Sequence, residues 1–256
     1  MAVTQPYFRT CRQFTDGSYA NDGKSEYIRD ERYAKSPQHY VRAFLMILKD
    51  MQTAFDYVEP AHKNLKCYSH RLHELLLRSC IEVEANFKAI LGENGYSRAR
   101  MSIKEDYSRV EPTHHLSTYE VRFPLWNGAG DVRSPFAAWA TGQPLPWYQA
   151  YNTTKHDRQT EFEDATLEHV VDAVSGLLVL LSAQFYTFDF SAHDDVLIAD
   201  GPNDGMETGI GSYLRVKFPT NWTPQEQYQF KWPNLVGLPS PFQQIDYTKV
   251  TPAQTV

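Results

Sequence analysis

The segment from Val170 to Phe190 is the longest apolar stretch of the chain, and it constrains the fold more than any other feature. Residues 177–181 are apolar on nearly every side of a helix, so this helix is expected to be the central and most buried one. Five polar or small residues interrupt the stretch: Asp172, Ser175, Gly176, Ser182 and Gln184. A buried core helix explains such an interrupted segment better than a membrane span does.

Two amphipathic helices are predicted earlier in the chain. Ser36 followed by Pro37 is typical of a helix start, because a hydroxyl can cap free amides and the fixed φ of proline suits the first turn. Apolar residues at spacings of three and four continue this helix to Pro60. A second helix is predicted from Asn64 to Leu91, with Gly92 as its stop. The short junction at Pro60 predicts an antiparallel hairpin.

The last core helix is predicted to begin at Thr160, because Glu163 three residues later fits a capping box. A short helix over 147–155 is expected before it. Residues 93–145 form an inserted region of loops and short strands, with alternation over 115–123 that predicts a strand. This insertion is too long for a simple connection, so we expect it to cap one end of the helices.

Both ends of the chain differ from the helical part, which spans residues 36–190. Residues 1–35 are polar and aromatic without a sustained period, and we expect an extended arm that lies on the body or is partly disordered. Residues 191–256 are rich in proline and glycine. They contain one good strand over Ser212–Phe218 and a candidate partner at Tyr228–Trp232, which together predict a small β appendage.

Charge and cysteine content narrow the function classes. The net charge is -6 and the sequence pI is about 5.8, which disfavours a large basic face for nucleic acid but is compatible with a small local basic site. Cys11, Cys67 and Cys80 form neither a disulfide framework nor a CxxC metal signature. The first residues lack the charged and apolar regions of a secretory signal. A cytoplasmic protein with no membrane contact is therefore predicted.

The segment 148–158 concentrates polar and aromatic side chains of several chemical kinds. Asn152 and His156 are four apart and share a helix face, with Lys155 beside them. We expect this segment at or near the N-terminus of the last core helix, where free amides favour anions. Lys155 and Arg158 would hold a phosphate while His156 moves a proton. The alternative is a helix junction whose polar residues cap termini and pair together, and residue types alone favour that alternative.

Residues 147–158, WYQAYNTTKHDR in one-letter code, lead into an apolar helix and resemble the Asn-x-x-Lys-His signature of HEPN-superfamily helical proteins. The resemblance covers residues 36–92 and 144–190. It implies a four- to five-helix up-and-down bundle and a homodimer with the motif at a composite cleft. It also implies RNA binding or metal-independent ribonuclease activity in phage defence, toxin or stress response, although the superfamily includes non-catalytic members. The expected fold is thus a mainly α bundle with a loop and strand insertion and a small C-terminal β appendage.

The motif departs from the catalytic form of the family in one respect. That form has an arginine before the histidine, whereas here Tyr151 stands in that position and Arg158 follows His156. The resemblance makes His156 the acid–base group and Asn152 the residue that orients it. Phosphate would be bound by cationic side chains, and bases would stack on tyrosines. The assigned residues are His156, Asn152 and Arg158 as catalytic, and Lys155, Tyr151 and Tyr148 as substrate-binding.

A second hypothesis assigns the chain to a different class. The protein would be a non-catalytic helical interaction module, in which the motif is structural and the β appendage engages a protein partner. No metal and no cofactor are predicted, because Glu59-x-x-His62 and Glu111-x-x-His114 both straddle prolines and no glycine-rich phosphate loop is present. The residues His70, His73, His169 and Asp172 are explained as solvated helix faces.

Overall fold

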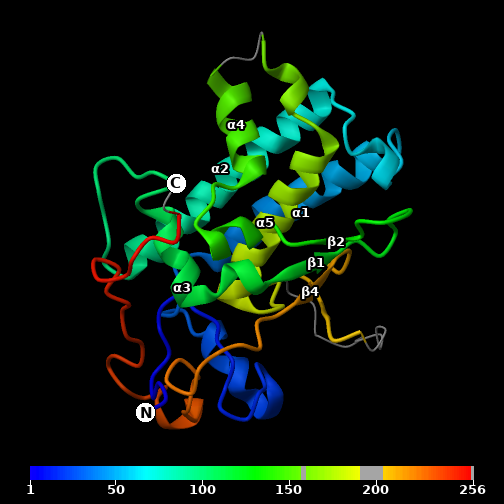
Figure 1. The fold of residues 1–256 in the computed structure, drawn as a ribbon. Coiled ribbons are helices and arrows are strands. Elements are labelled where there is room, and N and C mark those ends of the chain that lie inside the picture. Colours follow the sequence, from blue (N-terminus) through cyan, green and yellow to red (C-terminus); the bar gives the residue numbers. More distant parts are fainter. Residues whose placement is uncertain (157–159, 191–203, 255–256) are drawn as a thin grey trace.

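The computed structural model describes residues 1–156, 160–190 and 204–254, and only the backbone of His156. The fold is mainly α with a small antiparallel sheet, as the sequence predicts (Figure 1). The helices of the described residues are α1 (Pro37–Phe55), α2 (His70–Glu93), the short α3 (Glu111–His114), α4 (Pro146–His156) and α5 (Leu167–Phe185). α5 packs against α1, α2 and α4.

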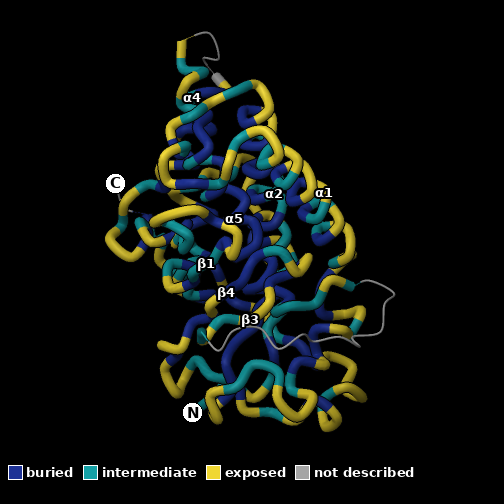
Figure 2. Tube along the Cα trace, turned by 90° about the vertical axis from the view of Figure 1, so that its right-hand side faces the viewer, coloured by how far each residue is buried: buried dark blue, intermediate teal, exposed yellow. Residues whose placement is uncertain are grey.

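The predicted central helix is α5. Every residue from Ala173 to Phe185 is buried, and the dark core around α5 in Figure 2 shows this burial. The helix is long and apolar enough to cross a membrane, but 83% of its most apolar window lies inside the protein. It is the core helix of a soluble body, because its apolar surface is covered by the other helices.

The start of α5 was predicted wrongly from the Thr160 capping box. The helix begins at Leu167, and the Thr166 hydroxyl accepts a hydrogen bond from the amide of His169 at 3.3 Å. Before it, the ring of Phe162 packs on the ring of His70 of α2, with centroids 4.6 Å apart. This contact holds residues 162–164 in a separate 3-10 turn, so the chain turns once more before α5 begins.

The first two helices also differ from their predicted bounds. α1 does begin at Pro37, but Ser36 has a φ of 48° and its hydroxyl makes no capping hydrogen bond. α2 begins at His70 instead of Asn64. Its N-terminus is capped by Ser69, whose hydroxyl accepts a hydrogen bond from the amide of Leu72 at 3.2 Å. Residues 62–64 form a 3-10 turn that is tied to the insertion, since the amide of residue 62 donates to the carbonyl of residue 127.

The sheet has the strand order β2-β1-β4-β3, with antiparallel neighbours. Its strands are β1 (Glu120–Arg122), β2 (Val132–Arg133), β3 (Glu207–Thr208) and β4 (Arg215–Lys217). Val121 of the insertion stands opposite Val216 of the C-terminal tail. The strands of the insertion and those of the C-terminal tail therefore form a single sheet.

The β predictions were right in place but wrong in extent and partner. β1 is shorter than the predicted strand over 115–123, because His115 has a φ of 54° and residues 116–118 form a 3-10 turn. The predicted partner at Tyr228–Trp232 does not pair with β4. Tyr228 instead forms isolated bridges with Val3 and Phe14 of the N-terminal segment.

Residues 1–35 are packed into the body more deeply than an arm lying on its surface. Arg9 and Cys11 are buried, and the amide of Cys11 donates to the carbonyl of Ala183 in α5 at 2.8 Å. The hydroxyl of Tyr33 donates to the carbonyl of Gln184. The N-terminal segment thus covers the C-terminal end of α5.

Candidate functional site

The predicted motif lies on α4, at the end of the molecule away from the N-terminus (Figure 1). α4 is anchored by Trp147, whose indole nitrogen donates to the carbonyl of Pro135 at 2.8 Å. The indole lies over Gly176 of α5, where an added Cβ would stand 3.1 Å from the ring. The glycine in the middle of α5 therefore leaves the space that the α4 indole occupies.

Two tyrosines of the motif join α4 to α2. The hydroxyls of Tyr148 and Tyr151 donate to the same carboxylate oxygen of Glu84, at 2.9 and 3.2 Å. Both residues are buried: Tyr148 is 5% exposed and Tyr151 is 1% exposed. Burial, followed by the charge of Glu84, raises the pKa of Tyr148, so its hydroxyl stays a donor. A base cannot reach either ring to stack on it in this arrangement.

Lys155 continues the same face of α4. Its ammonium donates to the hydroxyl of Tyr151 at 3.0 Å and lies 4.9 Å from the centre of that ring. This hydrogen bond raises the pKa of Lys155, so the side chain remains an ammonium. Glu84 also pairs with Lys88 of α2, 3.5 Å from ammonium to carboxylate. The described cationic and aromatic groups of the motif are thus engaged with one another and with α2.

The remaining assigned residues are Asn152, in the second half of α4, and His156 and Arg158 at its end or beyond it. Asn152 is half-buried, and the backbone of His156 ends α4. The side chain of His156 and all of Arg158 lie outside the described residues. The motif was expected at or near the N-terminus of the last core helix, but it spans α4, the helix that precedes α5. Lys155 and His156 lie in the last turn of α4, where the helix dipole favours cations and disfavours phosphate.

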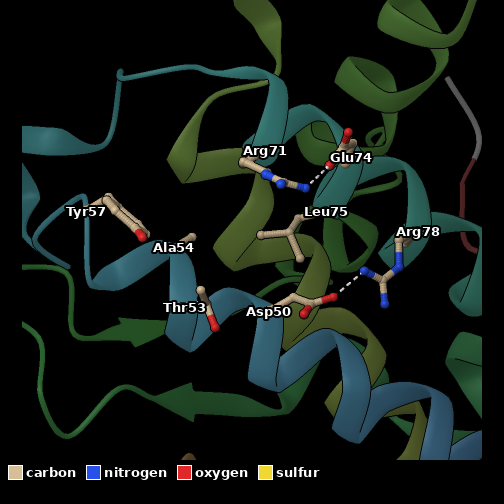
Figure 3. Close-up of a pocket in the computed structure, with 8 residues that line it drawn as sticks. All are labelled: Asp50, Thr53, Ala54, Tyr57, Arg71, Glu74, Leu75 and Arg78. Atoms are coloured by element: carbon tan, nitrogen blue, oxygen red, sulfur yellow. Dashed lines mark hydrogen bonds and ion pairs between the residues drawn. The ribbon is translucent and has the colours of Figure 1, made fainter.

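A cleft that sequence reasoning did not find lies between α1 and α2. It has a volume of about 520 Å³ and includes the exposed Tyr57 at its end (Figure 3). Arg78 of α2 pairs with Asp50 of α1 across it. On α2, Arg71 pairs with Glu74, with 3.0 Å between nitrogen and oxygen. The signal in the sequence was the row of charged residues on one side of α2, which is equally typical of a solvated helix face.

Apolar side chains stand exposed on the same surface. Met46 of α1 is 55% exposed, Ile81 of α2 is 53% exposed and Tyr57 is 86% exposed. Met46 and Ile81 line a second hollow of about 230 Å³ that shares Arg78 with the first cleft. We name this surface the α1–α2 face, and it comprises Met46, Asp50, Thr53, Tyr57, Arg71, Glu74, Arg78, Ile81 and Glu82.

The prediction of a solvated helix face was wrong for His73, which is buried. Other helical residues considered as metal ligands have protein partners. Asp172 accepts two hydrogen bonds from the guanidinium of Arg133, at 2.6 and 2.8 Å. His169 donates from Nδ1 to the carbonyl of Asp164 at 2.7 Å. Within residues 1–156, 160–190 and 204–254, no three side chains of the metal-binding types stand close enough to share an ion.

The chain was also compared with known proteins. No family model, no curated protein and no solved structure matches it.

Proposed function

We propose that this protein is a non-catalytic helical interaction module that associates through the α1–α2 face. The observation that carries the proposal is the combination found on this face. A cleft, exposed apolar side chains and arginines occur together there. Arginine, tyrosine and methionine are enriched at protein interfaces, where apolar side chains leave water and arginines reach carboxylates of the partner.

The occupant that fits this face is a second copy of the chain. A two-fold interface brings the same patch of each copy together, so the patch must be complementary to itself. The α1–α2 face meets one requirement of such a patch, because it carries both signs of charge: Arg71 and Arg78 stand among Asp50, Glu74 and Glu82. In the proposed dimer these arginines would also lie opposite carboxylates of the other copy, whereas a partner of one charge sign would meet like charges as well.

The face provides part of the area that a stable dimer needs. On α2 it runs from Arg71 to Glu82, eleven residue steps that at about 1.5 Å each give roughly 17 Å. Two adjacent helices of about 10 Å diameter make the surface about 20 Å wide. A standard interface buries about 800 Å² on each partner. The proposed dimer therefore buries neighbouring residues of α1 and α2 together with the face.

The α4 motif supports a structural role in this proposal. Tyr148, Tyr151 and Lys155 are bonded to one another or to Glu84, and they tie α4 to α2. The C-terminal end of α4 carries the negative end of the helix dipole, which does not favour the phosphates of RNA. The HEPN resemblance, with its RNA-binding or ribonuclease activity at His156, stays a prediction, and it is the rival that experiments must exclude.

A cytoplasmic location belongs to the same proposal. All three cysteines are free, with Cys11 and Cys80 buried and Cys67 half-buried. Free thiols persist where glutathione and thioredoxin keep cysteine reduced, as they do in the cytoplasm.

The first experiment measures the oligomeric state by sedimentation velocity. We expect the wild type to sediment as a dimer, and Met46→Asp and Ile81→Asp each to sediment as a monomer that is still folded by circular dichroism. Leu125→Asp is the matched control, because Leu125 is 70% exposed but lies outside the face. A wild type that is monomeric at all protein concentrations overturns the proposal, as does a dimer that survives both aspartates.

The second experiment tests catalysis. The purified protein is incubated with total RNA beside His156→Ala, with sedimentation confirming that both have the same oligomeric state. We expect no cleavage that depends on this histidine. Cleavage by the wild type that His156→Ala loses would establish the ribonuclease hypothesis in place of the non-catalytic one.

A further inference from the structure

Another pocket lies where the N-terminal segment meets the end of α5 and the C-terminal tail. Its volume is about 290 Å³, near the lower end of the range for small-ligand pockets. None of its described lining residues belongs to the α1–α2 face or to the α4 motif. The pocket is therefore independent of the proposed interface.

Three aromatic side chains form one wall of this pocket. The rings of Tyr19 and Tyr186 are parallel within 6°, with centroids 6.0 Å apart. Phe218 contacts both, at 5.1 Å from Tyr19 and 4.9 Å from Tyr186. The three rings pack on one another, so a ligand can lie only against the side of this cluster that faces the pocket, where an aromatic ring attracts an organic cation.

The tyrosines are held in place by the surrounding structure. Tyr19 donates to the carbonyl of Pro219 and accepts from the indole nitrogen of Trp222, both at 2.7 Å. Tyr186 follows α5 directly and has a φ of 56°, a backbone conformation that tyrosine rarely adopts. The geometry of this wall is thus set by the end of α5 and by the tail, before any ligand arrives.

Of the described residues, one charged side chain lines the pocket, and the nearby ammonium of Lys24, 3.3 Å from the Ser18 hydroxyl, is paired with Asp16. Among its described lining residues, Glu207 is the one charged side chain, and the others are aromatic, amide, hydroxyl or small. Burial first and the Glu207 carboxylate second raise the pKa of Tyr186, which indicates that this carboxylate acts on the ring. A phosphate or carboxylate ligand would be repelled. Divalent metal ions prefer several carboxylate ligands, whereas the described lining residues offer a single carboxylate.

We propose that this pocket binds a small organic cation of the ammonium type, with the aromatic wall against its alkyl groups and Glu207 against its charge. Quaternary and methylated ammonium groups have this combination of apolar surface and diffuse positive charge, and aromatic rings recognise them for that reason. The proposal concerns a ligand site and does not rest on the proposed dimer.

The probe is choline, titrated into the full-length protein and followed by calorimetry. Its neutral isostere, 3,3-dimethylbutan-1-ol, has the same shape without the charge and serves as the matched ligand. We expect saturable binding of choline and at least about tenfold weaker binding of the isostere. No saturable binding of choline, or equal binding of the two ligands, overturns the proposal.

Variants separate the two parts of the site. Glu207→Gln is expected to weaken choline binding several-fold, whereas Glu31→Gln removes an exposed carboxylate outside the pocket and leaves it unchanged. Tyr186→Leu is expected to weaken binding about tenfold and Tyr186→Phe to keep it within about twofold, because both carry the same backbone conformation but only phenylalanine keeps the ring. Equal affinity of Glu207→Gln and wild type, with both folded by circular dichroism, contradicts the role of the carboxylate.

Discussion

The guanidinium of Arg9 donates to the carboxylate of Glu93, with 2.7 Å between Nε and Oε1, although the two residues are 84 positions apart in the chain. The same guanidinium donates to the side-chain oxygen of Gln184 and to the carbonyl of Lys35, both at 2.7 Å. Arg9 is fully buried, so its charge is held by these partners instead of water. One side chain of the N-terminal segment therefore joins the ends of α2 and α5.

Replacing Arg9 is expected to destabilise the protein strongly. Arg9→Ala leaves the partners of a buried charge unpaired, which costs about 3–5 kcal/mol. Arg9→Lys restores little, because an ammonium cannot make three hydrogen bonds in the fork geometry of a guanidinium. Urea unfolding measures both. Arg32→Ala is the control, since Arg32 pairs with Asp30 at the surface, and a loss there above about 1 kcal/mol would contradict this ranking.

The buried His114 makes the free energy of unfolding depend on pH in a definite direction. Burial lowers its pKa from the usual 6.5 to about 3, and its Nε2 donates to the carbonyl of Arg9 at 3.0 Å. Between pH 6.5 and 3 the unfolded chain binds a proton at this imidazole but the native state does not. The free energy of unfolding therefore falls as the pH decreases through this window, by up to about 5 kcal/mol from this group.

The measurement compares His114→Gln with the wild type, because acidic groups also contribute to the slope. Urea midpoints taken from pH 7 to pH 4 are expected to fall less steeply in the variant. His62→Gln, at an exposed position, should follow the wild type. Parallel curves for wild type and His114→Gln would show that the buried imidazole does not control this loss.

The hydroxyl of Tyr151 links Glu84 and Lys155, so Tyr151→Phe is expected to cost about 1 kcal/mol of stability. The ring keeps its packing, and only the two hydrogen bonds are lost. Tyr68→Phe removes a hydroxyl from a residue that is 50% exposed and lies outside the α1–α2 face, and it should change nothing measurable. Thermal unfolding of both variants checks this, and equal melting temperatures would contradict the linking role.

Gly211 of the C-terminal tail packs against α1. Replacing it tests two contributions to stability, backbone strain and steric overlap. Its φ is +80°, and an added Cβ would stand 2.7 Å from a methyl of Leu45 and 2.9 Å from one of Leu48. Gly17 has a φ of +84° with nothing within 4 Å of the added atom. Both alanine variants carry the backbone strain, about 1 kcal/mol, and Gly211→Ala adds about 1–3 kcal/mol from overpacking. Denaturant unfolding showing equal losses would exclude the steric part.

The thiols are expected to react in a definite order with Ellman's reagent. Burial raises the pKa of Cys11 to about 12, and burial also raises the pKa of Cys80, so neither forms a thiolate in the folded protein at pH 8. Cys67 is half-buried and should react first. The Cys67→Ser variant is expected to show no fast phase until urea is added, and a remaining fast phase would contradict the burial of the other two.

The sequence by itself determined the elements whose signals are local. The apolar stretch that becomes α5 has to be buried wherever it is placed, and Pro37 starts a helix because its φ already fits one. The short helix over 147–155 and the strand near 215–217 were predicted for the same reason. In each case the period of the side chains or the backbone of one residue carries the information.

Only the tertiary structure decided which elements meet and where they begin. β4 pairs with β1 of the insertion instead of Tyr228–Trp232, and Phe162 delays the start of α5 by packing on α2. The burial of Arg9 and the turn of Tyr151 toward Glu84 depend on partners far away in the chain. Such contacts have no local signature, because their free energy comes from surfaces that exist only once the helices have packed.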